Sequence, residues 1–355
     1  MLNKRILWWG RHGNYGPDYP RNRTIQSKMR ELGCEIIEFQ PKVSQLADIE
    51  ALTKGFKDID LVWVPCFRQR DLKSAVRWSK SRSIPVVFDP LISAYDKRVF
   101  EKNKFPVDSL RAKRLLQWEQ GLFHSADFVI ADTQAHADYF AHEFKLPKEK
   151  LVVIPVSAEE SLFKPDVDFS GNATLEFLFF GTFIGLQGSD FIVRSLNEYK
   201  GPKIKVTLMG EGPDKALCEE LASSIQSMDV EVAFEGWVPI KELPARIQRA
   251  DACLGIFGEG KKTQRVIPNK VYQALACGKP VITLKSPAYP EGVLAESSAV
   301  VFLEELNSQM FVNLLAKLSM GELDAIKENA RPTYDRYFSN EVVAQQLITI
   351  FNALT

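Results

Sequence analysis

The stretch PNKVYQALACGKPVIT contains the residues best suited to binding a phosphate group. Pro268 and Asn269 are typical of the start of a helix, and Gly278 and Pro280 of its end. A helix N-terminus offers unpaired N–H groups and a partial positive charge, to which Lys270 adds a full one. The pattern therefore predicts a diphosphate site at the start of a short helix that leads into a buried strand.

Further cations are concentrated in the loop directly before this helix. The segment GEGKKTQRVIPNK carries Lys262 and Arg265 among four cations that end with Lys270. Charge-assisted contacts to phosphate oxygens are stronger than neutral hydrogen bonds, so these side chains suit a diphosphate ligand. An ordinary solvated loop is the alternative interpretation.

The elements that must position these residues alternate regularly along the chain. Strands are expected at 5–10, 34–39, 60–65, 85–89, 127–132 and 151–155, and again, after a turn-rich segment at 156–173, at 175–180, 204–210, 230–234, 252–257 and 281–284. Helical segments lie between them, which predicts an α/β fold of two doubly wound, Rossmann-like domains. Ligands of such sheets bind at the carboxyl ends of the strands, here expected in a cleft between the domains.

Length and composition agree with two globular domains. The 355 residues exceed what one core comfortably holds. The five cysteines are scattered without a CxxC pair, which favours reduced thiols in the cytoplasm. The apolar run at the start is too short for a signal peptide, and no run approaches the length of a transmembrane helix.

Charge is distributed unevenly although the net charge is zero. Residues 1–150 carry 26 Lys/Arg and 19 Asp/Glu, whereas residues 151–355 carry 19 and 26. Two basic clusters, at 68–82 and 97–114, account for much of the excess. They are either solvated helix faces or surfaces that attract an anionic acceptor or an anionic membrane. No nucleic-acid motif accompanies them, so nucleic acid is not expected as a partner.

The run QALACGKPVI, after its cationic loop, resembles the donor-site helix of the group 1, family-four-like glycosyltransferases with the GT-B fold. The resemblance is strong from about 177 to 285. It implies that a domain of residues 174–335 binds a nucleotide diphosphate sugar and that a domain of residues 1–158 binds the acceptor, with a linker at 159–173. It also implies that a C-terminal helix, about 336–355, packs back on the first domain.

The chain departs from this family at the two glutamates of its donor site. Aligned on the helix, the Glu-x7-Glu pattern falls on Arg265 and Gln273. Arg265 is expected to contact phosphate instead, and Gln273 can still bond a ribose hydroxyl. In the loop after the first strand of the domain, Thr182 and Gln187 replace the family's phosphate-binding Arg and Lys. The chain is therefore predicted to be a divergent branch, with donor identity and stereochemical outcome left open.

The resemblance places the other donor contacts at strand ends and at the start of the phosphate helix. They are Gly181, Gly210, Glu211, Trp237, Val238, Lys262, Asn269 and Lys270.

In the first domain, the loop GRHGNYG follows the first strand. Its glycine spacing does not match the dinucleotide motif GxGxxG. In the resembled enzymes this loop faces the acceptor. His12 is therefore a candidate base or hydrogen-bond donor, and Gly13, Asn14 and Tyr15 are candidate acceptor contacts. A histidine of an ordinary surface loop is the alternative.

Charged residues elsewhere in the first domain are candidates for the acceptor site. Arg21 and Arg23 suit an acidic group on the acceptor. Asp89, at a strand end, is a candidate base, and Asp96 is a candidate acceptor contact. A capping or turn role for Asp89 is equally open. Two further candidate carboxylates are Glu119 and Asp132.

Neither a metal nor a cofactor is expected. The four histidines lack zinc spacing. The DxD pattern occurs as Asp58-Ile-Asp60, directly before a strand, and as Asp166-Val-Asp168, in the linker. No Gly-x-Ser-x-Gly motif is present, which disfavours hydrolysis through a serine.

Together these features predict a hexosyltransferase-type enzyme that moves a sugar from a nucleotide diphosphate sugar to a hydroxyl of a glycan, a glycolipid or another cell-envelope precursor. The resemblance implies metal-independent transfer with retention, the helix dipole and cations stabilising the departing diphosphate. A cytoplasmic enzyme with peripheral contact to the inner face of the membrane is expected. The alternatives are a sugar-nucleotide epimerase of the same fold and a non-catalytic protein that binds a sugar nucleotide or a partner.

Overall fold

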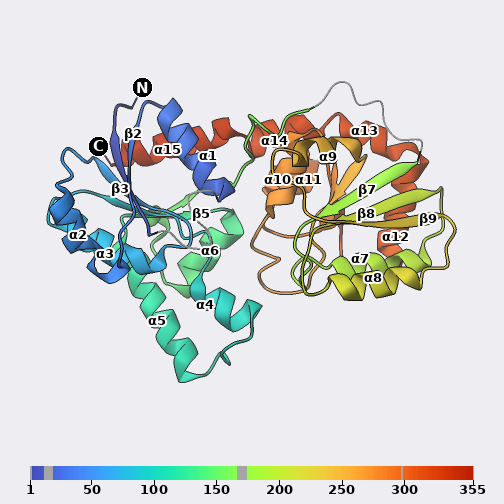
Figure 1. The fold of residues 1–355 in the computed structure, drawn as a ribbon, viewed down its shortest axis with the longest axis horizontal. Coiled ribbons are helices and arrows are strands. Elements are labelled where there is room, and N and C mark those ends of the chain that lie inside the picture. Colours follow the sequence, from blue (N-terminus) through green and yellow to red (C-terminus); the bar gives the residue numbers. More distant parts are fainter. Residues whose placement is uncertain (1, 12–18, 166–173, 297–298, 355) are drawn as a thin grey trace. The chain divides into compact units, whose positions relative to one another are not determined.

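The structure is a computed structural model that describes residues 2–11, 19–165, 174–296 and 299–354. The chain divides into two compact units, Met1–Ser157 with Asn340–Thr355, and Ala158–Ser339. Each unit contains a six-stranded sheet in which every described pairing is parallel (Figure 1). The predicted α/β class with two doubly wound sheets is thereby confirmed.

The sheet of unit 1 has the order β2-β1-β3-β4-β5-β6. Its strands are β1 (Arg5–Trp9), β2 (Glu35–Phe39), β3 (Leu61–Val64), β4 (Val86–Phe88), β5 (Phe128–Ala131) and β6 (Leu151–Val153). Its helices are α1 (Pro20–Glu31), α2 (Ala47–Lys54), α3 (Gln69–Lys80), α4 (Ala94–Asp96), α5 (Leu110–Ser125), α6 (Gln134–Glu143) and α15 (Asn340–Ala353), with short turns η1 (Ser44–Leu46), η2 (Lys97–Glu101) and η3 (Lys148–Lys150). The strand order reverses between β1 and β3, which makes the carboxyl ends of these two strands the topological switch point of the unit.

Helices cover both faces of this sheet. Successive side chains of a strand point to opposite faces. Ile6 and Trp8 of β1 pack in one core with α1 and α15, and Leu7 and Trp9 pack in the other with α2, α3, α5 and α6 (Figure 1). Strands that are apolar on both faces, as here, are typical of parallel sheets.

Unit 2 has the sheet order β12-β11-β10-β7-β8-β9. Its strands are β7 (Leu175–Phe180), β8 (Ile204–Met209), β9 (Val230–Glu235), β10 (Ala252–Leu254), β11 (Val281–Leu284) and β12 (Val300–Leu303). Its helices are α7 (Ser189–Ser195), α8 (Lys215–Ser223), α9 (Leu243–Arg249), α10 (Asn269–Ala276), α11 (Glu291–Glu296), α12 (Ser308–Lys317), α13 (Leu323–Lys327) and α14 (Ala330–Tyr337), with η4 (Leu196–Glu198) and η5 (Leu318–Glu322). Its switch point lies between β7 and β10.

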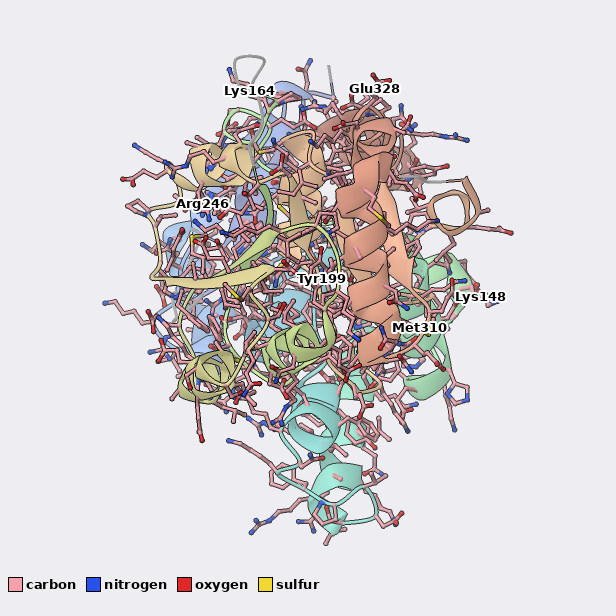
Figure 2. All side chains as sticks on the ribbon, turned by 90° about the vertical axis from the view of Figure 1, so that its right-hand side faces the viewer. Lys148, Lys164, Tyr199, Arg246, Met310 and Glu328 are labelled. Atoms are coloured by element: carbon pink, nitrogen blue, oxygen red, sulfur yellow. The ribbon has the colours of Figure 1, made fainter. Side chains whose placement is uncertain are left out.

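A buried ionic cluster fastens α9 to the sheet of unit 2. Arg246 (labelled in Figure 2) donates to Glu176 at 2.7 Å and to Glu235 at 2.7 Å. Glu176 also accepts from the hydroxyl of Thr207. Because the guanidinium binds both carboxylates, the cluster holds α9 on the sheet and has a structural role.

Two details differ from the expected elements. Strand β10 ends at Leu254 and not at 257, because the chain passes close to β11 at Gly255, where a Cβ would lie 2.5 Å from Thr283. Helix α2 and strand β12 were not expected: the apolar residues of α2 are separated by polar ones, and β12 is a run of only four residues. The last helix begins at Asn340 and belongs to unit 1, where Val343 and Leu347 join the core beside α1.

Candidate functional site

Glycines pack the loops closely at the carboxyl edge of the sheet of unit 2. Gly210, after β8, has a φ of 138°, and a Cβ there would lie 2.0 Å from the carbonyl oxygen of Gly181, after β7. A Cβ at Gly258, after β10, would lie 2.2 Å from the carbonyl oxygen of Gly185. Only glycine permits these approaches. The three loops therefore form one compact backbone surface at the switch point.

Lys270, the second residue of α10, is buried beneath this surface. Its side chain is 5% exposed, and its Nζ lies 3.6 Å from the ring centroid of Phe179 and 3.2 Å from the carbonyl oxygen of Gly255. Burial lowers the pKa of Lys270 well below its ordinary value. A buried amine with one carbonyl partner and an aromatic face has unused capacity to bind an anion.

The space beside Lys270 can admit a polar ligand. A Cβ at Gly181 would lie 3.1 Å from Nζ, so glycine keeps the space beside the amine open. The Oε1 atom of Gln187 is buried and has no hydrogen-bond partner within the described part of the chain; as an acceptor, it suits a hydroxyl of a ligand and not a phosphate oxygen. Pro268 caps α10 without a side-chain hydrogen bond, so no side chain competes for the first N–H groups of the helix. The helix start and Lys270 are the features for which the sequence predicted a diphosphate site, and that site stays a prediction.

The cations of the preceding loop are less deeply placed. Arg265 is half-buried and donates from Nε to the carbonyl oxygen of Lys261 at 3.0 Å, and Lys262 is half-buried. Asn269 is half-buried and Gln273 is buried within α10. Lys270 therefore lies deepest among these predicted donor contacts.

An exposed indole lies at the rim of the same edge. Trp237, after β9, is 53% exposed, and its Cζ2 atom would lie 3.4 Å from a Cβ at Gly210. Val238 is half-buried beside it. Glu211 accepts a hydrogen bond from Lys215 at 2.8 Å, and Thr182 is exposed. An exposed ring next to bare backbone is a surface on which a flat base can stack.

In unit 1, Arg21 and Asp89 bind each other. The Nε of Arg21 donates to both carboxylate oxygens of Asp89, at 2.8 and 3.0 Å, and Nη1 donates to the carbonyl oxygens of Ile154 and Pro155. Both side chains are only 1% exposed. Burial opposes the charge of Arg21, but Asp89 raises the pKa of that guanidinium above its ordinary value. The pair joins α1 to the ends of β4 and β6, a structural arrangement that differs from the expected acceptor and base roles.

Two other carboxylates of this unit also have structural partners. Glu119 accepts from the hydroxyl of Ser93 at 2.7 Å and from two backbone N–H groups at the start of α4. Asp132 accepts from Nδ1 of His136, the two atoms lying 2.6 Å apart. Asp96 is buried at the end of α4, and Arg23 is half-buried on α1. His12, Gly13, Asn14 and Tyr15 lie outside the described residues.

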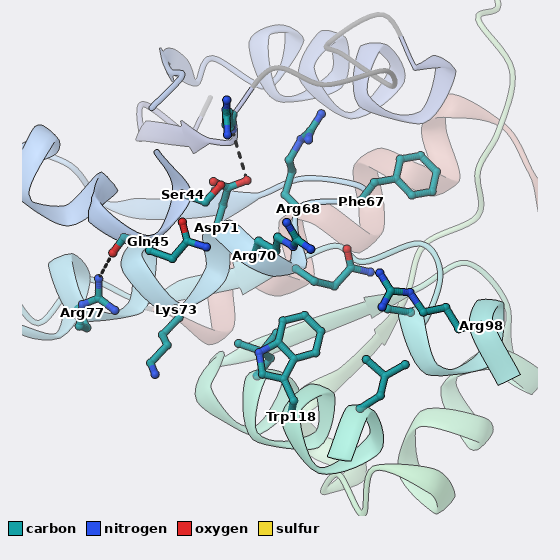
Figure 3. Close-up of a pocket in the computed structure, with 15 residues that line it drawn as sticks. Ser44, Gln45, Phe67, Arg68, Arg70, Asp71, Lys73, Arg77, Arg98 and Trp118 are labelled. Carbon is teal, nitrogen blue, oxygen red and sulfur yellow. Dashed lines mark hydrogen bonds between the residues drawn. The ribbon is translucent and has the colours of Figure 1, made fainter. Parts of the chain in front are cut away.

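A pocket of about 950 Å³ lies in unit 1 (Figure 3). It is lined by Arg11 after β1, by Phe67 and Arg68 after β3, and by residues of η1, α3, α4, η2 and α5. The pocket therefore includes the switch point of this sheet. The basic clusters at 68–82 and 97–114 contain five of its six cations, all except Arg11, but no local motif indicated that both clusters line one cavity.

No metal site accompanies either region in the part of the chain that the structure covers. No group of three or more His, Cys, Asp or Glu side chains there has a metal-binding arrangement. Asp60 accepts from the backbone N–H of Arg5 at 2.7 Å, and Asp58 forms an ion pair with the same residue, so this DxD pair supports the sheet. Asp166 and Asp168 lie outside the described residues. None of the described helices is long and apolar enough to span a bilayer.

Two parallel-sheet units of this kind define an α/β protein with two Rossmann-like domains. Residues 174–319 match the family of glycosyl transferases group 1. The putative colanic acid biosynthesis glycosyltransferase WcaL of Escherichia coli is 24% identical over 241 residues, covering 66% of this chain and 59% of that protein. The chitobiosyldiphosphodolichol beta-mannosyltransferase of Debaryomyces hansenii is 22% identical over 262 residues, covering 65% of this chain and 54% of that protein.

The fold of the whole chain is similar to that of Anabaena HepE in complex with UDP, with a TM-score of 0.69 at 17% identity over 99% of this chain and 100% of that one. Residues 174–319 thus carry the match to group 1 glycosyl transferases that the donor-helix motif predicted, and the fold of the chain is that of the GT-B structures. The matched region spans little more than half the length of these two curated relatives.

Proposed function

We propose that the protein transfers a sugar from a nucleotide diphosphate sugar, with UDP as the nucleotide, to an acceptor hydroxyl. The observation that carries the proposal is Lys270, a buried amine beside the uncapped start of α10 and the glycine-packed loops. The solved structure of HepE holds UDP, which supports a uridine nucleotide here. In this proposal, Trp237 stacks on the base and the diphosphate contacts Lys270.

Lys270 would also stabilise the leaving group. The amine has a depressed pKa because of burial, and a bound diphosphate restores its charge. As the bond from the anomeric carbon to the phosphate oxygen breaks, negative charge grows on the diphosphate next to this cation and the helix N-terminus. No step of this scheme needs a divalent metal, so turnover should persist in EDTA.

The proton of the acceptor hydroxyl needs a base. Asp89, Glu119 and Asp132 are each engaged by structural partners. We assign the proton to an oxygen of the departing diphosphate. The acceptor then attacks from the side on which the diphosphate leaves, and the anomeric configuration is retained. The anomeric coupling constant of the product, measured by NMR before mutarotation, tests this assignment.

A lipid-linked acceptor fits the surface of unit 1. The segment from η2 to α5 projects from the rest of this unit (Figure 1) and exposes Val107 and Leu110 among the cations Lys102, Lys104, Arg111, Lys113 and Arg114. Apolar side chains ringed by cations suit an anionic membrane surface. The name of the Debaryomyces hansenii relative describes a mannosyltransferase that acts on a dolichol-linked diphosphate, which supports a lipid-linked acceptor.

Sedimentation with vesicles tests the membrane contact. Leu110→Glu should reduce binding to vesicles that contain phosphatidylglycerol. Ile49→Glu, at a similarly exposed apolar position on α2, should not. Equal binding by both variants would remove the membrane contact from the proposal and leave the donor site unaffected.

The donor site is tested by calorimetry with UDP and UDP-glucose. Lys270→Met, which keeps the packing on Phe179, should lower the affinity by about 10- to 100-fold, because a hydrogen-bonded charge contributes about 1.5–3 kcal/mol. Lys279→Met is the matched control. Lys279 is also buried but lies beyond the carboxyl end of α10, so its loss should leave nucleotide affinity unchanged. Equal affinities of wild type and Lys270→Met would refute the proposed site.

A further inference from the structure

The pocket of unit 1 has a composition that points to a ligand. Six cationic side chains line it, and Asp71 is the single carboxylate among its lining residues; the cations are Arg11, Arg68, Arg70, Lys73, Arg77 and Arg98. Arg77 is neutralised by Asp48, at 2.6 Å. A cavity lined mainly by one sign of charge concentrates ligands of the opposite sign.

Several of these cations have no counter-charge among the residues that the structure describes. Within the described residues, the side chains of Arg70, Lys73 and Arg98 make no hydrogen bond or ion pair. Burial lowers the pKa of Arg68, and the like charge of Arg11 adds to this effect against the attraction of Asp71. The pocket therefore has an excess of positive charge, which a bound anionic ligand would neutralise.

The wall that α5 forms is apolar. Leu115, Trp118 and Leu122 of this helix line it, and Trp118 remains 41% exposed. In Figure 3, Arg68 and Arg70 lie on one side and Trp118 on the other, with Arg98 at one end. Phe67 has a left-handed backbone with a φ of 64°, which is uncommon for an aromatic residue. Such conformations cluster at functional sites, where the surrounding structure maintains them.

We propose that this pocket binds a phosphate or diphosphate group of the acceptor together with the apolar chain that the group carries. That this ligand is the acceptor rests on the function proposed above. Binding of an apolar chain that carries a phosphate does not depend on that function. Arg70 and Arg98 contact the phosphate oxygens, and Trp118 packs against the first apolar segment. The volume of about 950 Å³ suits a ligand of this size.

The number and type of cations favour phosphate over a single carboxylate. A carboxylate is satisfied by one bidentate arginine, which would leave two of Arg70, Lys73 and Arg98 without a counter-charge. A phosphate or diphosphate has more oxygens and more charge, so several guanidinium groups can bind it at once. The apolar wall would remain exposed to water beside inorganic phosphate but is covered by an attached chain.

The test is calorimetry on the full-length protein with its donor site saturated by UDP, so that a diphosphate cannot bind at Lys270. The probes are geranyl diphosphate, inorganic diphosphate and geraniol. Geranyl diphosphate should bind at least about tenfold more tightly than inorganic diphosphate, because the chain buries apolar surface. Geraniol alone should bind weakly or not at all.

Three variants separate the contributions of charge and apolar contact. The double variant Arg70→Gln/Arg98→Gln should weaken both diphosphates by about tenfold or more. Trp118→Ala should weaken geranyl diphosphate only. Lys80→Gln removes one exposed cation of α3 that does not line the pocket, and it should bind as wild type does.

Thermal unfolding of each variant shows whether weaker binding results from loss of the fold. The double variant should melt at or above the wild-type temperature, because it relieves repulsion between unpaired cations. The proposal is overturned if the double variant binds geranyl diphosphate as wild type does, or if Lys80→Gln lowers the affinity equally. If instead UDP and UDP-glucose fail to bind but geranyl diphosphate binds with this pattern, the proposed transfer reaction fails and the pocket assignment stands.

Discussion

The two sheets have switch points of opposite character. In unit 2, glycine backbones close the edge around one buried lysine, and Lys270 has little access to solvent. In unit 1, the edge opens into a pocket of about 950 Å³ with several exposed cations and an apolar wall. The same fold therefore has a closely packed sheet edge in unit 2 and a large open pocket in unit 1.

The difference matches the two ligands that we propose for these sites. A close-fitting backbone surface positions one small ligand accurately, as a diphosphate beside a breaking bond requires. A wide, charged pocket tolerates variation in the ligand and attracts it from a distance. The loop residues at the strand ends, more than the sheets, determine whether the edge is closely packed or open.

The largest effect is expected at the ion pair that supports the edge of unit 1. Asp89→Asn leaves the buried guanidinium of Arg21 without its counter-charge, which should lower the free energy of unfolding by about 3–5 kcal/mol. The unfolding temperature of the variant should fall by about 10 °C. Asp60→Asn, in a partly exposed pair with Lys4, should cost no more than about 1 kcal/mol.

The same variant decides between the two roles considered for Asp89. If Asp89→Asn keeps the wild-type unfolding temperature but loses turnover at saturating donor, the carboxylate acts as a base and the edge of unit 1 does not depend on the pair. Loss of stability with donor affinity retained would establish the structural role.

The packed edge of unit 2 is tested at Gly210. Gly210→Ala places a Cβ 2.0 Å from the carbonyl oxygen of Gly181 at a φ of 138°, so the loops after β7 and β8 must separate. The variant should lose about 3 kcal/mol of stability and most of its affinity for UDP. Gly185→Ala is the control in the same loop region, because nothing lies within 4 Å of its Cβ position. Equal UDP affinity in both variants would show that close packing is not needed.

Much of the architecture was accessible from the sequence, since strand and helix periods and the helix start at Pro268-Asn269 are local signals. Lys270 was predicted as a donor ligand from its place in that motif, and the structure finds it buried beside two strand-end loops. Its deep burial was not predicted, because it depends on Phe179 and Gly255, which are distant in the sequence.

The pocket of unit 1 shows the opposite case. Arg70 and Arg98 belong to two separate basic clusters that look like solvated helix faces in the sequence. Only the fold brings them to one cavity with Trp118. The sequence did not predict the pairing of Arg21 with Asp89 either, because the two residues are 68 positions apart. Each of them, taken alone, is most simply interpreted as an exposed polar residue.

The pH dependence of donor binding separates the buried lysine from the exposed cations. Burial holds the pKa of Lys270 well below its ordinary value, and a bound diphosphate should raise it again. Affinity for UDP-glucose should therefore fall as the pH rises between these two pKa values, by up to about tenfold per pH unit. Calorimetry in two buffers with different ionisation enthalpies should detect proton uptake, which Lys270→Met abolishes.

The lowered pKa of Lys270 makes the stability of the unliganded protein change with pH in the opposite direction to donor affinity. The unfolded chain binds the proton of Lys270 more tightly than the folded chain does. Stability should therefore increase as the pH rises from the lowered folded pKa toward the unfolded value of about 10.4. A stability curve of Lys270→Met that keeps the wild-type slope in this window would assign the effect to another group.

The smallest effect, and the most direct contrast between the two sites, is the response to salt. Counter-ions screen exposed charges strongly over a Debye length of about 10 Å at 0.1 M and about 3 Å at 1 M, but screen buried charges much less. Raising sodium chloride from 0.05 to 0.5 M should weaken geranyl diphosphate binding by roughly fivefold, about 1 kcal/mol. UDP-glucose binding should change less, because its main cation is buried. Equal salt dependence of the two ligands would mean that water and ions reach Lys270 as freely as they reach Arg70, and the contrast between the two edges would then lie in their shape alone.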